Sequence, residues 1–171
     1  MTGPAPRFPI GPIQPLPTRD RAALEDVAAR MTAATAEWRA LVTPLDAAGL
    51  AHRYRPGAWT VAQLAHHTAD AHLHGLNRLR YALTTPDYVI QPFDQDAWLT
   101  LPDATLPVTV ALNLLDAVNA HWIALLEGMD ATDLDRMITH PNEGPQDLWQ
   151  LVAKHDWHLR HHLAQARGAL G

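Results

Sequence analysis

Two histidines near the C-terminus, His158 and His162, are four residues apart in a segment whose composition favours a helix. Residues four apart on an α-helix differ by about 40° around the axis and lie roughly 6 Å apart along it. The two imidazoles therefore point the same way and can share one metal ion, because Zn–N bonds are about 2.0–2.1 Å long. Since such pairs also occur on ordinary polar helix faces, a metal site needs a third ligand.

A second histidine-rich window supplies the candidate third ligand. Eight of the eleven histidines fall in two windows: His66, His67, His72 and His74, and then His155, His158, His161 and His162. The expected helix in the first window has one face formed by Leu64, His67, Ala71, His74 and Arg78. His67 lies in the middle of that face, whereas His66 and His72 are turned off it by about 100° and 140°. We therefore expect His67 to complete the metal site and the other two to make ordinary polar contacts.

Neighbouring side chains could support such a site. Asp70 follows His67 by three residues and could accept the other N–H of an imidazole, the usual arrangement around metal-bound histidine. An exposed aspartate is the alternative. His74 and His155 could line a substrate pocket, although solvated or buried histidines without a role are as compatible with the pattern.

Cysteine is absent, which excludes disulfides, thiolate nucleophiles and cysteine-based metal sites. Any metal must be bound through nitrogen or oxygen. Three nitrogen ligands leave a fourth position open to water or substrate, whereas structural zinc usually has four protein ligands. Because no good fourth ligand is apparent, we expect a catalytic centre that lowers the pKa of a bound water or thiol. Hydrolysis and thiol transfer both remain open.

Four segments have the composition and apolar spacing of long helices. They span about residues 19–42, 60–83, 106–128 and 146–167, with Gly168 as the expected stop of the last helix. Thr60 and Gln63 form a capping-box pair, and Pro107 opens the third helix. A short helix near 133–137 and a turn at 140–145 complete the pattern, without strand-like alternation. We predict an all-α four-helix bundle whose long connection between the second and third helices crosses one end or contributes to the site.

The N-terminal segment differs from the rest. Its prolines are Pro4, Pro6, Pro9, Pro12, Pro15 and Pro17, which exclude a regular helix. We predict an extended arm over residues 1–18 and a single domain over residues 19–171. Phe8, Ile10 and Ile13 would let the arm pack over the bundle or over a partner subunit; a solvated tail is the alternative.

Composition narrows the classes of partner. The formal charge of −5 and the lack of a basic run argue against nucleic acid as a partner. No uninterrupted apolar run reaches eighteen residues, and no signal-peptide pattern is present at the N-terminus. We therefore expect a cytoplasmic protein that does not bind membranes.

Other residues have both a functional and an ordinary interpretation. Asp94 and Asp96 could act as a general base near the metal, although turn capping is the more usual role. Arg55 and Arg78 could bind a substrate carboxylate as forked donors, although surface ion pairs are more common. The six tryptophans, at positions 38, 59, 98, 122, 149 and 157, are expected mainly in the core.

Several motifs together carry a family resemblance. The run Tyr54-Arg55-Pro56-Gly57-Ala58-Trp59-Thr60-Val61, with His67 eight residues after the tryptophan, resembles the signature of the DinB/YfiT-like metalloenzyme superfamily. The segment His158-x-x-x-His162-x-x-Gln165 is similar to the closing helix of that family. Phe8-Pro9-Ile10-Gly11, the segment Gln91 to Trp98, the stretch Trp122 to Leu126, and His140-Pro141 resemble pieces of the YfiT branch in the same order. Thr68 and Gln165 depart from the residues usual there, but neither is one of the three proposed ligands.

The resemblance implies a four-helix bundle, commonly a homodimer, with one zinc or nickel ion per chain bound by His67, His158 and His162. It also implies an enzyme in which a metal-activated thiolate attacks a small electrophilic molecule, with bacillithiol, mycothiol or glutathione as the kind of thiol. The YfiT branch itself is described as metal-dependent hydrolases. The catalytic residues and the substrate stay unknown.

Three functions therefore remain as hypotheses. The first is a metal-dependent enzyme, either a thiol S-transferase or a hydrolase that uses metal-bound water. The second is a non-catalytic, stress-associated bundle that binds metal. The third is a histidine-rich scaffold that binds no metal.

Overall fold

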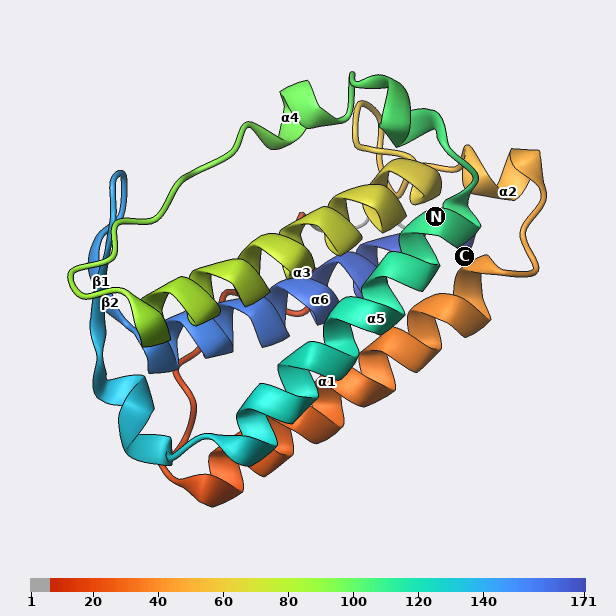
Figure 1. The fold of residues 1–171 in the computed structure, drawn as a ribbon. Helices are drawn as coiled ribbons and strands as arrows, with labels where there is room; N and C mark the ends of the chain where they lie inside the picture. The colour runs from red at the N-terminus through yellow and green to blue at the C-terminus, as the bar shows by residue number, and fades with distance from the viewer. Residues whose placement is uncertain (1–6) are drawn as a thin grey trace.

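The computed structural model describes residues 7–171 and has four long helices packed as a bundle (Figure 1). They are α1 (Arg21–Val42), α3 (Val61–Thr84), α5 (Val108–Gly128) and α6 (Leu148–Leu170). Both α1 and α3 pack against α5 and α6. The first two long helices, α1 and α3, therefore lie diagonally opposite each other in the bundle, and α3 lies directly beside α6. This arrangement confirms the predicted all-α four-helix bundle and places the two histidine windows on adjacent helices.

Shorter elements connect the long helices. They are α2 (Ala47–Leu50), α4 (Gln95–Trp98), the 3₁₀ helices η1 (Pro102–Thr105) and η2 (Ala131–Asp135), and the strands β1 (Met137–His140) and β2 (Gly144–Asp147). The connection between α3 and α5 carries α4 and η1 along one side of the bundle (Figure 1).

The sequence did not predict the β-hairpin. Strands β1 and β2 pair antiparallel, with Met137 opposite Asp147 and His140 opposite Gly144. Each strand has only four residues, too few to show an alternating pattern, and Gly144 supplies a positive φ of 83° where the chain turns back. The prediction that Gly168 ends the last helix was also wrong, because α6 continues to Leu170.

Local sequence explains where the two site-bearing helices begin. Thr60 and Gln63 form the predicted capping box at the start of α3, and Asp147 and Gln150 form a second one at the start of α6. Each box satisfies backbone N–H groups that have no partner within the helix. The two capping boxes thus fix where the helices that carry the histidines begin.

The described part of the N-terminal arm lies against α6. Phe8 packs against Trp157 and His161, with ring centroids 6.4 and 5.6 Å away, and the Trp157 indole N–H donates to the carbonyl of Gly11 at 3.1 Å. These contacts favour a strap over a solvated tail. Pro4 and Pro6 lie outside the described residues, and the boundary at residue 18 stays a prediction.

The helix α5 is the one helix of residues 7–171 long and apolar enough to cross a membrane by length and composition alone. Core helices of soluble proteins share this property. The buried face of α5 includes Leu112, Leu115, Val118 and Trp122, and it packs between α1 and α3. Helix packing thus accounts for the apolar character of this face.

Close packing of α3 on α6 depends on Gly75. A Cβ atom at this position would lie 2.4 Å from Nδ1 of His155, well inside van der Waals contact. The imidazole of His155 is buried beside Trp122, with ring centroids 5.6 Å apart, so it has little room to move. Only glycine fits between the two helices here.

We predict that Gly75→Ala destabilises the fold by about 1–3 kcal/mol, because the added methyl group overpacks this contact. The matched control is Gly128→Ala at the end of α5, where nothing lies within 4 Å of the new Cβ. Urea unfolding followed by circular dichroism measures both free energies. Equal midpoints for the two variants would contradict the proposed packing role.

Acid should destabilise the protein through buried neutral histidines. Burial lowers the pKa of His72 to about 4 from 6.5, although its ring hydrogen-bonds Oδ1 of Asn119 at 3.3 Å. Between these pH values the unfolded chain binds a proton that the folded chain does not, so stability is full above pH 6.5 and falls as the pH drops toward 4. The shift corresponds to about 3 kcal/mol.

We therefore expect His72→Gln to make the unfolding free energy less dependent on pH between 6.5 and 4. The number of protons taken up on unfolding should fall by about one. Unfolding curves at intervals from pH 7 to 4 measure the slope. His121→Gln on the exposed face of α5 is the control, and an equal loss of slope in that variant would show that the effect does not come from burial.

Candidate metal centre

Three imidazoles from two helices meet inside the bundle. Nε2 of His158 lies 3.1 Å from Nε2 of His67 and 3.1 Å from Nε2 of His162. One ring nitrogen of each residue lies within 4.8 Å of the others. His67 comes from α3, and His158 and His162 are one turn apart on α6. The structure thus brings the three predicted residues to one point.

The hydrogen bonds of Gln165 determine where His162 carries its proton. Nε2 of Gln165 donates to the carbonyl of Arg7 at 2.9 Å, so Oε1 is the amide atom that lies 2.7 Å from Nδ1 of His162. Because that oxygen can only accept, His162 is protonated on Nδ1 and presents a free lone pair on Nε2. This is how a metal-binding histidine is normally oriented by a neighbouring group.

All three rings are neutral near neutral pH. Burial lowers the pKa of His67 to about 4 and, with repulsion from neighbouring histidines, holds the pKa values of His158 and His162 well below 6.5. Neutral imidazole is the form that binds metals. Proton binding therefore competes weakly with metal binding at this position.

The residues present fit a divalent metal ion. A proton on Nε2 of His158 can be directed at only one of its two neighbours, so hydrogen bonding cannot satisfy both 3.1 Å contacts in a neutral cluster. The two 3.1 Å nitrogen separations are close to the edge of a tetrahedron with 2.0–2.1 Å bonds, about 3.3 Å. No carboxylate belongs to the cluster within the described part of the chain. The candidate donor set is therefore three ring nitrogens, and its role as a metal site stays a prediction.

Aromatic rings cover His67. Trp59 lies over it with ring centroids 4.6 Å apart, and its indole N–H donates to Oδ1 of Asp96 at 3.1 Å. Phe93 lies 6.4 Å from His67 on a segment that also carries Trp98. The long connection between α3 and α5 thus forms part of the site.

Two cavities reach the histidines. The first, which we call the Arg55 cavity, has a volume of about 390 Å³ and is lined by His158, His162, Arg7, Tyr54 and Arg55, among others. The second, the Arg78 cavity, has a volume of about 310 Å³ and is lined by His67, His158, Phe93, Arg78 and His140, among others. Gln95 and His158 line both. The histidine cluster therefore lies where two ligand-sized cavities meet.

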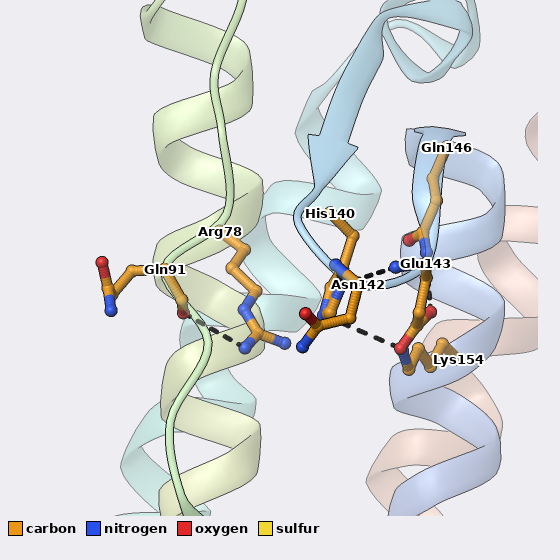
Figure 2. A network of polar contacts seen from close by, with 7 residues as sticks. All are labelled: Arg78, Gln91, His140, Asn142, Glu143, Gln146 and Lys154. Atoms are coloured by element: carbon orange, nitrogen blue, oxygen red, sulfur yellow. Dashed lines mark hydrogen bonds and ion pairs between the residues drawn. The ribbon is translucent and has the colours of Figure 1, made fainter.

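The Arg78 cavity is bounded by α3 and by the turn of the β-hairpin. Figure 2 shows Arg78 pointing from α3 toward His140 and Asn142, with Lys154 and Glu143 beyond them. Lys154 donates to both carboxylate oxygens of Glu143, at 2.6 and 2.8 Å. The β-hairpin, which the sequence did not predict, thus forms one wall of the site.

Some predicted supporting residues lie elsewhere. Asp70 was considered either as an orienting acceptor or as an exposed aspartate; within the described residues its carboxylate makes no hydrogen bond to His67, and Gln165 orients His162. Asp94 caps α4, as the ordinary interpretation held, and Asp96 positions Trp59. His66 contacts the carbonyl of Leu106 at 3.0 Å. His66 and His72 thus make the polar contacts expected of them.

The tryptophans divide between two roles. Trp38, Trp122 and Trp149 are buried in the core, as expected. Trp59 and Trp157 line the Arg55 cavity, and Trp98 packs on Phe93 and His74. Residue spacing alone could not distinguish core tryptophans from those at the site. The position of Trp59 just before the capping box that starts α3 was one signal that it lies near the site.

Comparisons with known proteins agree with this geometry. A family model described as the DinB superfamily matches residues 30–166. A protein of Oceanobacillus iheyensis, named "Putative metal-dependent hydrolase", is 39% identical over 111 residues, which are 65% of this chain and 64% of that protein. The chain thus spans slightly less than two thirds of that relative.

Solved structures share the fold. YfiT from Bacillus subtilis, described as a probable metal-dependent hydrolase with an unusual four-helix bundle topology, is similar with a TM-score of 0.88 and 28% identity over 94% of this chain and 93% of its own. A mycothiol-dependent maleylpyruvate isomerase is similar with a TM-score of 0.66 and 16% identity over 83% of this chain and 60% of its own. This second likeness concerns the fold alone.

We predict that the purified protein carries close to one equivalent of zinc or nickel per chain and that His162→Ala removes it. Gln165→Leu should weaken metal affinity by about 10–100-fold, because the ring of His162 loses its orienting acceptor. Elemental analysis after dialysis against a competing chelator measures both. His66→Ala, next to His67 but directed at Leu106, should retain the metal; retention in His162→Ala would exclude this centre.

Proposed function

The chain belongs to the DinB superfamily, and from that premise we propose that it is a metal-dependent enzyme that joins a low-molecular-weight thiol to a small electrophile. The observation that carries this proposal is the position of the three histidine nitrogens between two cavities. A reaction between two organic molecules needs two binding spaces that meet at the reacting atoms, whereas hydrolysis needs one such space and water.

The three donors would be His67, His158 and His162. A divalent cation held by them would supply Lewis acidity and lower the pKa of a thiol or water in its open position. In the transfer reaction, the thiol gives up its proton, its sulfur forms a bond to the electrophilic carbon, and the leaving group departs with the electron pair of the broken bond. The proton passes to water in the adjoining cavities.

The surrounding side chains have separate tasks in this proposal. Gln165 holds His162 so that Nε2 faces the centre. Trp59 and Phe93 cover His67 and limit access of bulk water. Arg55, half-buried in its cavity, offers positive charge to an anionic group of one reactant.

Hydrolysis is the second candidate, because the Oceanobacillus relative and YfiT are both described as metal-dependent hydrolases. The same three histidines would serve, with water in place of the thiol. A non-catalytic metal-binding bundle is the third candidate. The homodimer and the cytoplasmic location remain predictions, and light scattering of the purified protein would test the former.

We expect the metal-loaded protein to consume a thiol together with a chromogenic electrophile such as 1-chloro-2,4-dinitrobenzene. The assay uses bacillithiol, mycothiol and glutathione in separate reactions, with p-nitrophenyl esters and anilides in parallel. His162→Ala should lower the rate by about a hundredfold or more, because the metal is lost with it. The metal-retaining variant His66→Ala is the control.

The outcomes separate the candidates. Metal-dependent hydrolysis without thiol consumption would replace transfer by hydrolysis. If fully loaded protein turns over neither class of substrate, the non-catalytic bundle becomes the better description.

A further inference from the structure

Arg78 is a buried cation without an acidic partner. Its side chain is only 9% exposed, and its Nε atom has no hydrogen-bond partner. Its one hydrogen bond in the described chain is a long one, 3.4 Å from Nη2 to the carbonyl of Gln91 (Figure 2). Buried charges are normally paired, since taking them out of water is costly. The guanidinium therefore has unused donor capacity in a position where donors are rarely left free.

The carboxylate that lines the same cavity is already neutralised. Glu143 accepts two hydrogen bonds from Lys154 and one from Gln146 at 2.7 Å, and it lies 3.7 Å from Nε2 of His140. No ion pair joins Glu143 to Arg78. Burial lowers the pKa of Arg78 below its usual value, and Tyr88 and Glu143 oppose that shift. The side chain stays protonated, because arginine cannot be deprotonated at physiological pH in proteins.

A second side chain in the cavity also lacks partners. His155 is buried, and neither of its ring nitrogens has a hydrogen-bond partner. Burial, with repulsion from Arg78, keeps its pKa well below 6.5, so the ring is neutral and has one N–H donor. Arg78 and His155 both line the Arg78 cavity. Because the ring nitrogens of His155 are enclosed beside Gly75 and Trp122, the neutral ring does not compensate the charge of Arg78. Arg78 is therefore the unpaired charged group that a ligand in this cavity would contact.

The position of Arg78 suits a ligand that reaches the histidine cluster. Arg78 lies on the same face of α3 as His67, eleven residues later, which is about 16 Å along the helix axis. Side chains on a helix lean toward its N-terminus, and the longer side chain of Arg78 leans further than that of His67. The remaining distance of roughly 10–15 Å can be spanned by a small organic molecule together with the open side of the histidine cluster.

We propose that Arg78 is the recognition group for the carboxylate of a small organic acid, which is the electrophile of the reaction. The forked guanidinium matches the two oxygens of a carboxylate. The rest of the ligand then extends past Phe93 toward His67 and His158. The role of this acid as the reacting electrophile rests on the proposed function. The binding of a carboxylate by Arg78 can be tested separately.

The test is calorimetric binding of benzoate and of its neutral counterpart benzamide to the protein as purified and after metal removal. Benzoate should bind at least about tenfold more tightly than benzamide, and Arg78→Gln should lower benzoate affinity by about tenfold or more while leaving benzamide binding unchanged. This dependence on Arg78 should persist without metal. The metal content of Arg78→Gln should equal that of the unmodified protein.

One variant serves as the matched control. Arg80→Gln removes the same charge from an exposed position two residues further along α3 and should retain benzoate affinity within about twofold. Arg55→Gln removes a half-buried arginine from the other cavity and tests whether benzoate binds there instead; the Arg78-dependent affinity should persist in this variant. Arg78→Gln should also unfold at an equal or higher temperature than the unmodified protein, because a buried unpaired charge is removed.

Three results would overturn the proposal. Benzoate affinity that is lost on metal removal but unchanged in Arg78→Gln would place the carboxylate on the metal. Loss of affinity in Arg55→Gln alone would place it in the other cavity. A lower unfolding temperature with unchanged binding in Arg78→Gln would make Arg78 a structural residue. By contrast, Arg78-dependent binding in a protein that holds no metal would refute the proposed function and leave the carboxylate site standing.

Discussion

The structure depends on holding three largely buried imidazole nitrogens close together inside the bundle. Such an arrangement is unfavourable by itself, since buried polar atoms without partners cost free energy and neighbouring lone pairs repel. The bundle opposes this cost with a large apolar core around the two helices that carry the histidines. The centre is therefore maintained by packing elsewhere, as is usual for sites whose geometry is set for a ligand.

The helix arrangement makes this possible. Because α1 and α3 lie on a diagonal, α3 is free to pack directly on α6, and the glycine at position 75 permits close approach at the level of His155. The capping boxes at Thr60 and Asp147 fix where each helix begins. With the starts fixed, the rotational positions of His67, His158 and His162 follow from helical periodicity alone.

This dependence on periodicity explains how much of the site could be predicted. The meeting of His67 with the pair on α6 follows from spacings of three and four residues and from the general rule that bundle sites use inward side chains on facing helices. The hairpin wall and the aromatic cover could not be predicted, because they depend on how a long connection and a short turn pack in three dimensions. Asp70 illustrates the limit: its spacing from His67 was suitable, but its carboxylate makes no contact with that ring. The sequence identified Arg78 as a possible hydrogen-bond donor to a substrate carboxylate. Only its burial without an acidic partner, seen in the structure, distinguishes it from a surface arginine.

The contact between the carbonyl of Arg7 and Gln165 links one end of the chain to the orientation of His162. Protein engineers usually treat a chain end as a neutral attachment point for a fusion partner or an affinity tag. Here a bulky addition that displaced residues 7–11 would remove one of the hydrogen bonds that hold the amide of Gln165, leaving Tyr54 and His161 to orient it. A polyhistidine tag on this arm would also bring competing imidazoles beside the centre.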